Sequence, residues 1–495
     1  MHMFAIVLTC LVCVGHGRRV QTSAQLQSRH SPEALAEVSH ADRQVGAIGT
    51  SNPAKKFATL LMTLNPPHAF NPSHPSMRVP VSHAHGVASS RLSRVSPLMS
   101  TAVEDFKTKW AAVPAEQPPQ SPQTIWGEKI GDILKAQAAA KAKEHEEYPR
   151  EVKKADVMPA DADEEAELEW FLANAKEIKD DMERSGAVVF RGFSLMKQQP
   201  GFESFYRAIG MNPCLDPLHS VSARPTADGN KNSAVYEAVN KESRKNFFIG
   251  MHNEFVGTRA PRAAAFVCFK AAETGGEFLI ADGRAVFRDL DSDVLERIYR
   301  RSIRYGVMEL PFFGWVDDLP EPLQSPVMNT IRSLASAAIN AKVDFNVDLL
   351  EQRGGYDNTR LLQARAPSQA PIVRHPVTGE PTWFCNVHSH SAKLRKNREK
   401  VYGAEKFEDG ASQINKSDFY FGDDGDLSDT DLKHLDDVTN KNIKYIKMSE
   451  GDVVLLDNYK TMHGRNVFDG TRKHAVAWFG GWEGEDEQRS RQWNL

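Results

Sequence analysis

The sequence predicts an α+β fold, mainly β, whose core is a jelly-roll barrel (a double-stranded β-helix) with flanking helices. Three observations lead to this prediction. Helical periodicity marks 164–184, β-prone runs dominate after residue 262, and Glu254 of a His-x-Glu triplet lies 209 residues before a second histidine, His463. In a jelly roll, strands far apart in the sequence become neighbours around one cavity. A single site shared by these distant residues is therefore compatible with that fold.

The composition limits the kinds of partner. The chain has 495 residues, of which 41% are hydrophobic and 25% charged, and its formal net charge is −4. These values are ordinary for a globular protein of one to three domains. The charge is too small for a field that grips nucleic acid, and no apolar run reaches the roughly 18 residues of a spanning helix. We expect a small-molecule substrate, no nucleic acid and no transmembrane segment, and the oligomeric state stays open.

The first hundred residues have the composition of a targeting leader. Residues 4–14 are apolar, which suits a signal peptide over 1–17. The segment 18–100 is rich in Ser, Pro and basic residues, and no acidic residue occurs between Asp42 and Glu104. Such a segment is typical of a transit peptide and lacks the apolar density to fold alone.

The order of these two segments indicates a destination. A signal peptide followed by a transit-like region is the two-part leader of proteins sent to plastids with extra membranes. We therefore predict a plastid (chloroplast) location. The alternative is a secreted protein with a disordered pro-region.

The rest of the chain divides into an extension and one larger domain. Residues 101–162 are expected to be a helical linker, with a helix over 133–147. A jelly-roll catalytic domain is expected over 163–495. Its cysteines are widely spaced and fit no zinc pattern, so we interpret them as reduced structural thiols. They are Cys214, Cys268 and Cys385.

Periodicity and turn residues place the elements of this domain. Helices are expected over 164–184, 202–209, 284–303 and 327–341. The acidic stretch 418–431 lacks the ligand spacing of a calcium loop, and we interpret it as a solvated loop. Strands are expected at 186–193, 263–269, 277–281, 443–447, 453–456, 461–465 and 475–479.

Three residues form a candidate metal site. His252 and Glu254 are two residues apart, so on a strand both side chains point to one face and can reach one ion. With His463 they make a 2-His-1-carboxylate set, which leaves positions open on a ferrous ion for oxygen chemistry. Chance is the alternative, because three other His-x-Asp/Glu triplets occur in the chain. A lone histidine is also more often a surface or hydrogen-bonded core residue.

Arg472 is the candidate ligand for an organic acid. It follows His463 by nine positions. Its planar guanidinium could hold a distal carboxylate through two parallel hydrogen bonds. An ordinary surface arginine is the alternative.

Five sequence blocks occur in a recognisable order. They are Gly-Ala-Val-Val-Phe-Arg-Gly-Phe (186–193), Met-His-Asn-Glu (251–254), Gly-Gly-Glu-Phe-Leu-Ile-Ala-Asp (275–282), His-Pro-Val-Thr-Gly-Glu (375–380), and Gly-Asp-Val-Val-Leu-Leu-Asp-Asn (451–458) with the His-Gly-Arg and Gly-Thr-Arg that follow. Together they resemble the TauD/TfdA-like family of Fe(II)/2-oxoglutarate-dependent dioxygenases over 165–482.

The resemblance assigns roles to these residues. It implies that His252, Glu254 and His463 hold Fe(II), that Arg472 binds 2-oxoglutarate, and that O₂ is the second cosubstrate. One residue departs from the family pattern. Phe278 stands where the family usually has a threonine that hydrogen-bonds the cosubstrate. A phenyl ring cannot donate that bond, so either Arg472 holds the keto acid alone or another donor serves.

The resemblance also bears on the reaction. Halogenating relatives replace the metal carboxylate with a small residue, so Glu254 implies hydroxylation or desaturation of a small organic substrate. With a plastid location, that substrate could be a tetrapyrrole, as in the desaturation of a chlorophyllide side chain by chlorophyll c synthase. The alternatives are a hydroxylase of an amino acid, a betaine or a sulfonate, and a non-catalytic jelly roll that binds a ligand.

Overall fold

The computed structural model describes residues 128–482 apart from short gaps. The predicted signal peptide (1–17), transit-like segment (18–100) and residues 101–127 lie outside the described residues. No helix in the described part of the chain is long and apolar enough to span a membrane. The gaps are 144–146, 217–223, 230–233, 241–243, 257–258, 342–344, 354–359 and 403–416.

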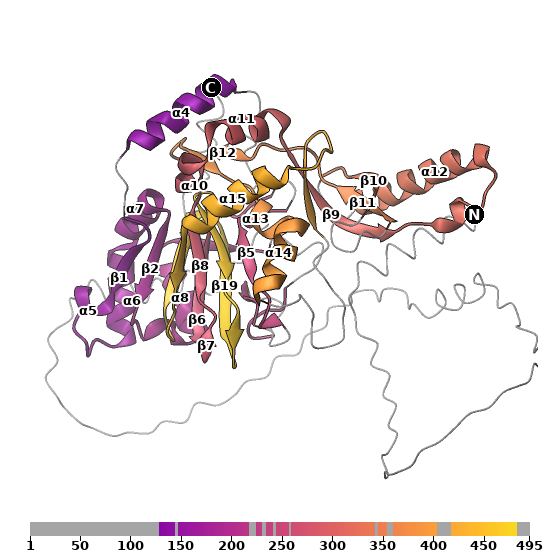
Figure 1. The fold of residues 1–495 in the computed structure, drawn as a ribbon. Helices are drawn as coiled ribbons and strands as arrows, with labels where there is room; N and C mark the ends of the chain where they lie inside the picture. The colour runs from indigo at the N-terminus through magenta and orange to yellow at the C-terminus, as the bar shows by residue number, and fades with distance from the viewer. Residues whose placement is uncertain are drawn as a thin grey trace, which may run out of the picture. The chain divides into compact units, whose positions relative to one another are not determined.

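A seven-stranded sheet forms one side of the core (Figure 1). Its order is β1-β2-β16-β6-β19-β3, and β4 also pairs with β19. β1 runs parallel to β2, while the other neighbours are antiparallel. The strands are β1 (Arg150–Lys153), β2 (Ala187–Arg191), β3 (Met211–Cys214), β4 (Val235–Glu237), β6 (Ala263–Lys270), β16 (Val453–Asp457) and β19 (Lys473–Trp482).

A four-stranded antiparallel sheet forms the opposite side. Its order is β15-β8-β17-β5. The register pairs His463 with His252 across β17 and β5, and Arg465 with Phe278 across β17 and β8. The strands are β5 (Ile249–His252), β8 (Phe278–Asp282), β15 (Ile443–Ile446) and β17 (Thr461–Arg465).

The two sheets pack face to face. Phe266 and Trp478 of the seven-stranded sheet share an apolar cluster with Phe278 and Ile280 of the four-stranded sheet. Successive side chains of a strand point to opposite faces. The alternate residues, such as Ala265, accordingly join a second cluster with the helices on the outer face. The predicted mainly-β core is confirmed, and all seven predicted strands are present as β2, β6, β8, β15, β16, β17 and β19.

Helices cover the outer faces of both sheets (Figure 1). The helices α6 (Glu164–Ala173), α7 (Ala175–Ser185) and α8 (Gln199–Ala208) pack on the seven-stranded sheet. The helices α4 (Ile130–Ala142), α10 (Gly283–Asp289), α11 (Ser292–Arg301) and α15 (Asp429–Lys441) pack on the four-stranded sheet.

Two predicted helices are each divided in the structure. The helix expected over 164–184 breaks at Asn174, whose side-chain amide donates to the carbonyl of Trp170. The helix expected over 284–303 breaks at Leu290, where the backbone is extended and the side chain is fully buried. In both cases a local or tertiary contact interrupts a continuous periodicity, which sequence spacing alone cannot reveal.

Part of the predicted extension joins the sheet and its helices. α4 begins and ends earlier than the helix expected over 133–147. Its Gln137 donates to the carbonyls of Phe287 (2.9 Å) and Leu290 (2.7 Å), which fixes α4 against α10. β1 pairs along its whole length with β2. The domain boundary at 163 stays a prediction.

A third sheet corrects the interpretation of 418–431. That stretch begins as a strand and ends in α15, so a solvated loop was wrong for half of it, and 422–428 alone form turn and loop. Asp424, between them, forms ion pairs with the buried Arg304 (2.9 Å) and Arg365 (2.8 Å). The sheet has the order β10 (Asp348–Arg353), β11 (Arg360–Arg365), β9 (Ile303–Pro311), β14 (Asp418–Phe421), and α12 (Glu321–Asn340) packs against β10. The remaining elements include β7 (Thr274–Gly275), β12 (Ile372–Arg374), β13 (Pro381–Trp383), β18 (Phe468–Asp469), α5 (Lys154–Val157), α13 (Val387–His390) and α14 (Ala392–Tyr402).

Candidate metal centre

His252, Glu254 and His463 converge in the structure. Their potential ligand atoms all lie within 4.8 Å of one another. The two imidazole rings have centroids 4.4 Å apart, because β5 and β17 are neighbours and the two histidines are opposite each other in register. In the part of the chain that the structure describes, no other group of three such residues meets this condition. His434, from a competing triplet, instead accepts a hydrogen bond from the backbone of Asp291.

Glu254 is positioned by loop contacts rather than by a strand. β5 ends at His252, so the prediction that both residues share a strand face was only half right. The side chain of Asn458 accepts from the backbone N–H of Glu254 (2.9 Å) and donates to its carbonyl (2.8 Å). Asn253 and Asn386 exchange hydrogen bonds of 2.8 and 3.0 Å. These amides satisfy the buried backbone on both sides of the carboxylate and fix its direction.

The two histidines are in the form that binds metal. Burial lowers the pKa of His252 and brings the pKa of His463 well below its ordinary value. Both rings are therefore neutral near pH 7, with a lone pair available for an ion. Nδ1 of His252 lies 2.8 Å from the carbonyl oxygen of Gly250, which places its proton on Nδ1 and its lone pair on Nε2. Nδ1 of His463 is buried without a hydrogen-bond partner.

Arg224 contacts the carboxylate of the centre. Its Nη2 donates to one oxygen of Glu254 at 2.8 Å, and its Nε lies 3.1 Å from Asp216. Its guanidinium lies 5.3 Å from the ring centroid of Trp478. A carboxylate has two oxygens, so this pairing leaves one of them for a metal while restricting the rotation of the side chain.

Aromatic rings surround the His463 side of the centre. The ring centroids of Phe266, Phe278 and Trp478 lie 5.0, 6.3 and 6.0 Å from that of His463. All three rings are buried between the sheets. Phe278 therefore lies in the interior beside His463, and its phenyl ring offers no hydrogen bond there.

Arg472 lies in the same interior and donates to neutral acceptors. Its Nη1 donates to the carbonyl of Ala238 at 2.8 Å, and its Nε is buried without a partner. Burial lowers the pKa of Arg472 to about 10, so it stays charged. The turn at Gly276 lies against it: φ there is +71°, and a Cβ would lie 3.5 Å from Cδ of Arg472. The predicted Arg472 is thus a buried cation, not a surface residue.

These residues fit a ferrous ion and an organic acid. Two neutral imidazoles and one carboxylate within coordination reach of each other form the set that suits Fe(II). A buried cation with an unused N–H fits a carboxylate. The three described cysteines are buried and form no disulfide, as predicted.

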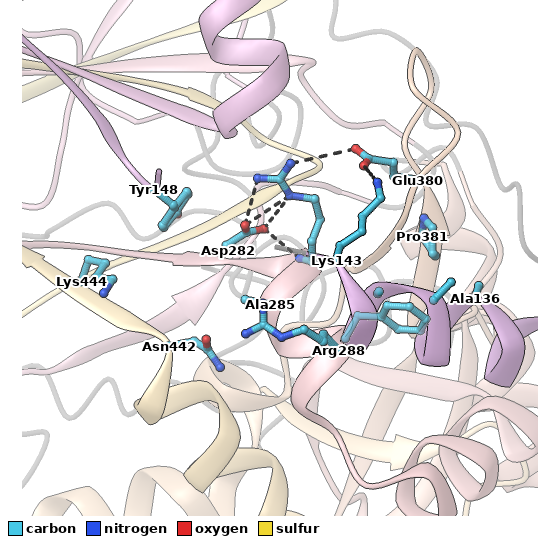
Figure 2. Close-up of a pocket in the computed structure, with 14 residues that line it drawn as sticks. Ala136, Lys143, Tyr148, Asp282, Ala285, Arg288, Glu380, Pro381, Asn442 and Lys444 are labelled. Atoms are coloured by element: carbon cyan, nitrogen blue, oxygen red, sulfur yellow. Dashed lines mark hydrogen bonds and ion pairs between the residues drawn. The ribbon is translucent and has the colours of Figure 1, made fainter. Parts of the chain in front are cut away.

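A cavity of about 530 Å³ lies between α4, α10 and the end of β8 (Figure 2). None of the three metal-binding candidates lines it. Two ion pairs lie in its wall: Lys143 lies 3.5 Å from Glu380, and Arg284 lies 2.9 Å from Asp282.

Comparison with known proteins decides the family. The model of the Taurine catabolism dioxygenase TauD, TfdA family matches residues 154–478, more than half of the chain. The chain belongs to this family. The predicted family and enzyme class, a 2-oxoglutarate-dependent dioxygenase that uses Fe(II) and O₂, are thereby confirmed. The non-catalytic alternative is set aside, because the chain belongs to a family of dioxygenases.

Individual relatives are distant. The Dapdiamide synthesis protein DdaC of Enterobacter agglomerans is 24% identical over 317 residues, which are 63% of this chain and 87% of that protein. The structure of the PvcB protein from Pseudomonas aeruginosa is 15% identical, with a TM-score of 0.35, over 62% of this chain and 79% of that one. An asparagine oxygenase structure is 12% identical, with a TM-score of 0.36, over 78% and 92% of the two chains.

Several residues of the centre escaped sequence reasoning in this TauD/TfdA-family protein. Arg224 carries no motif, and only the fold brings it to Glu254. Asn386 and Asn458 act through backbone hydrogen bonds that no spacing encodes. Arg465 could have been found, because it lies two positions after His463 on the same strand and strand alternation places both on one face.

Proposed function

We propose that this protein is an Fe(II)/2-oxoglutarate-dependent oxygenase in which His252, Glu254 and His463 hold the iron. The observation that carries the proposal is the convergence of their ligand atoms to within 4.8 Å. We also infer that the two sheets close around this centre as a jelly-roll barrel, since the four-stranded and seven-stranded sheets share one apolar interior.

The chain's own residues bind the metal and the keto acid, orient the metal ligands and exclude water. His252 and His463 are neutral by burial, and Arg224 restrains Glu254, so the ligand set is formed in advance. Phe266 and Trp478 keep water from His463. Arg472 supplies a buried cation for the distal carboxylate of the keto acid. When bound, the iron and 2-oxoglutarate supply O₂ activation that removes hydrogen from a substrate carbon, with formation of succinate and CO₂.

Metal content and cosubstrate turnover test this proposal. Purified protein loaded with Fe(II) should retain about one iron per chain and form succinate from 2-oxoglutarate under O₂. Loss of one metal ligand removes several kcal/mol of stabilisation, so Glu254→Ala should lower turnover about 10³-fold or more. Glu177→Ala, an exposed carboxylate on α7, is the matched control and should change neither quantity. Equal iron retention and succinate formation in both variants would refute the proposed centre.

A plastid tetrapyrrole is the substrate that we propose first. The proposal is supported by the leader-like composition of residues 1–100, which predicts a plastid location. The reaction would be the desaturation of a chlorophyllide side chain. Hydroxylation of the same side chain would be its first stage. Incubation with chlorophyllide-type tetrapyrroles should give a product lighter by two hydrogens, detected by mass and absorption. No change with active, iron-loaded protein would eliminate this substrate class.

Hydroxylation of an amino acid, a betaine or a sulfonate is the alternative. The match to the Taurine catabolism dioxygenase TauD, TfdA family supports it, because taurine is a sulfonate. A panel of these acids, measured by substrate-dependent succinate formation, distinguishes the two proposals. A rise with an amino acid and none with a tetrapyrrole would favour the alternative.

A further inference from the structure

Two buried arginines meet at a single neutral oxygen beside the metal centre. Arg465 and Arg472 are 3% and 4% exposed. Their Nη1 atoms lie 3.2 and 3.4 Å from the same acceptor, the carbonyl oxygen of Val239. Among the described residues, no carboxylate forms an ion pair with either guanidinium. The acceptors that contact them in the described part of the chain are backbone carbonyls and the side-chain amide of Asn240.

The neighbouring titratable groups do not neutralise this pair. Burial raises the pKa of the Cys268 thiol to about 12, so it carries no negative charge at neutral pH. Burial keeps the pKa of His474 well below its ordinary value, so it adds no positive charge. Among the described residues, no negative charge therefore compensates these two buried cations. Buried charges are normally paired, because desolvation without a counter-charge is strongly unfavourable.

Unused donors and a strained residue point to a missing anion. The Nε atoms of both arginines are buried without a hydrogen-bond partner. Val239, whose carbonyl both arginines share, has φ of +49°, a conformation that is unfavourable for a β-branched residue. Buried unsatisfied donors and strain of this kind are concentrated at ligand sites.

The position of Arg465 indicates which anion would bind between the two arginines. Arg465 lies two residues after His463 on β17, so both side chains are on one face of the strand. In the register of β17 and β8, Arg465 is directly opposite Phe278. Phe278 stands where the TauD/TfdA family usually has a threonine that binds the cosubstrate. Arg465 is therefore the cross-strand neighbour of the position where the family usually has the threonine hydroxyl.

We propose that Arg465 is a second cationic anchor for the distal carboxylate of 2-oxoglutarate, beside Arg472, and replaces the hydroxyl donor that Phe278 cannot supply. The proposal rests on the proposed function of the metal centre. It predicts that the site discriminates strongly for a keto acid with a distal carboxylate over one without it. If Arg465 only donated to the backbone carbonyls of Arg244 and Phe247, the site would not discriminate between these keto acids.

The test measures binding of two keto acids to Mn(II)-loaded protein without O₂, by calorimetry. 2-Oxoglutarate carries the distal carboxylate and 2-oxobutyrate lacks it. Arg465→Met should weaken 2-oxoglutarate binding about 10- to 100-fold, the range for one charge-assisted hydrogen bond, and leave 2-oxobutyrate nearly unchanged. Arg300→Met, an exposed arginine of α11 that pairs with Glu296, is the matched control and should change neither.

A double-mutant cycle with position 278 tests the replacement itself. Phe278→Thr restores a hydroxyl, and in the Arg465→Met background it should recover about 10-fold in 2-oxoglutarate affinity, more than it adds to the wild type. Additive effects of the two substitutions, or equal loss of both keto acids in Arg465→Met, would overturn the proposal. If Arg465→Met does not fold, Arg465→Gln serves: it keeps a hydrogen-bond donor and loses the charge, so a 2-oxoglutarate affinity equal to wild type would overturn the proposal as well.

The two proposals fail in different ways. Wild-type protein that binds neither keto acid when loaded with metal would contradict the proposed function. Wild-type protein that binds 2-oxoglutarate, together with an Arg465→Met variant that binds it equally well, would contradict only the role of Arg465.

Discussion

Two pairs of buried arginines in this protein differ in the charge of the group between them. Arg304 and Arg365, in the third sheet, share the carboxylate of Asp424 at 2.9 and 2.8 Å. Arg465 and Arg472, between the two main sheets, share only the carbonyl of Val239. Both bridging residues have a positive φ, +67° at Asp424 and +49° at Val239.

The difference separates a structural pair from a binding pair. The first pair contains its own counter-charge, so the folded chain is electrostatically complete there. Nε of neither Arg304 nor Arg365 is left unsatisfied, whereas Nε of both Arg465 and Arg472 is. A cation pair that has no carboxylate partner among the described residues is ready for an anion that arrives with a ligand.

The largest effect is expected at Arg472. Arg472→Met removes a cation that can make two charge-assisted bonds, each worth about 1.5–3 kcal/mol, so 2-oxoglutarate affinity should fall about 10²- to 10³-fold. The free energy of unfolding should stay equal or rise, because one of two uncompensated buried charges is removed. Calorimetric titration and urea unfolding measure both. A stability loss without a change in affinity would mean that this pair, too, is structural.

The reciprocal result is expected at Asp424. Asp424→Asn leaves Arg365 buried without its carboxylate. Breaking a fully buried pair costs about 3–5 kcal/mol; since Asp424 is about a third exposed, we expect about 2–3 kcal/mol. Cosubstrate affinity should be unchanged. Asp423→Asn is the matched control, because Asp423 pairs with the exposed Arg301 and such surface pairs contribute little. Equal losses in the two variants would contradict the comparison.

Arg224 is an intermediate case, a cation whose carboxylate partner is a metal ligand. In Arg224→Met, Glu254 loses its restraint, and loss of such outer contacts typically weakens metal binding about 10- to 100-fold. Removal of a nearby cation acts in the opposite direction, but Arg224 is partly exposed and also pairs with Asp216, so this gain is screened. We expect a net weakening of about 10-fold in Mn(II) or Fe(II) affinity. Tighter binding would show that the charge outweighs the orientation.

The smallest effect at neutral pH is expected at His474, whose contribution to stability changes only in acid. Burial lowers the pKa of His474, so below the ordinary histidine pKa of about 6.5 the unfolded chain gains a proton there that the folded chain does not. The neutral ring's contribution is complete above that pH and declines as the pH falls, by about 1.4 kcal/mol per unit. Urea unfolding of His474→Gln between pH 5 and 7.5 should show a shallower decline than the wild type. If the unfolding free energies of wild type and variant fall equally with pH, the proton is taken up at another group.

The sequence determined the strand pattern and named the candidate metal ligands. Continuous β-prone apolar runs bounded by turn residues predicted β6, β16 and β19, because a strand that is buried on both faces is apolar along most of its length. His252, Glu254, His463 and Arg472 could be named in advance because their residue types limit the chemistry, and ordered blocks around them resemble one family. The departure at Phe278 was visible in the same way.

The tertiary structure alone decided which charges are compensated. Asp424 was taken for part of a solvated loop, yet it neutralises two arginines from strands more than fifty residues away. Arg465 gave no sign that its neighbours would be neutral carbonyls, and Arg224 no sign that it would reach Glu254. Periodicity reports which side chains are buried, since burial repeats along an element. The partner of a buried charge is set by the packing of distant segments, and a linear pattern does not contain it.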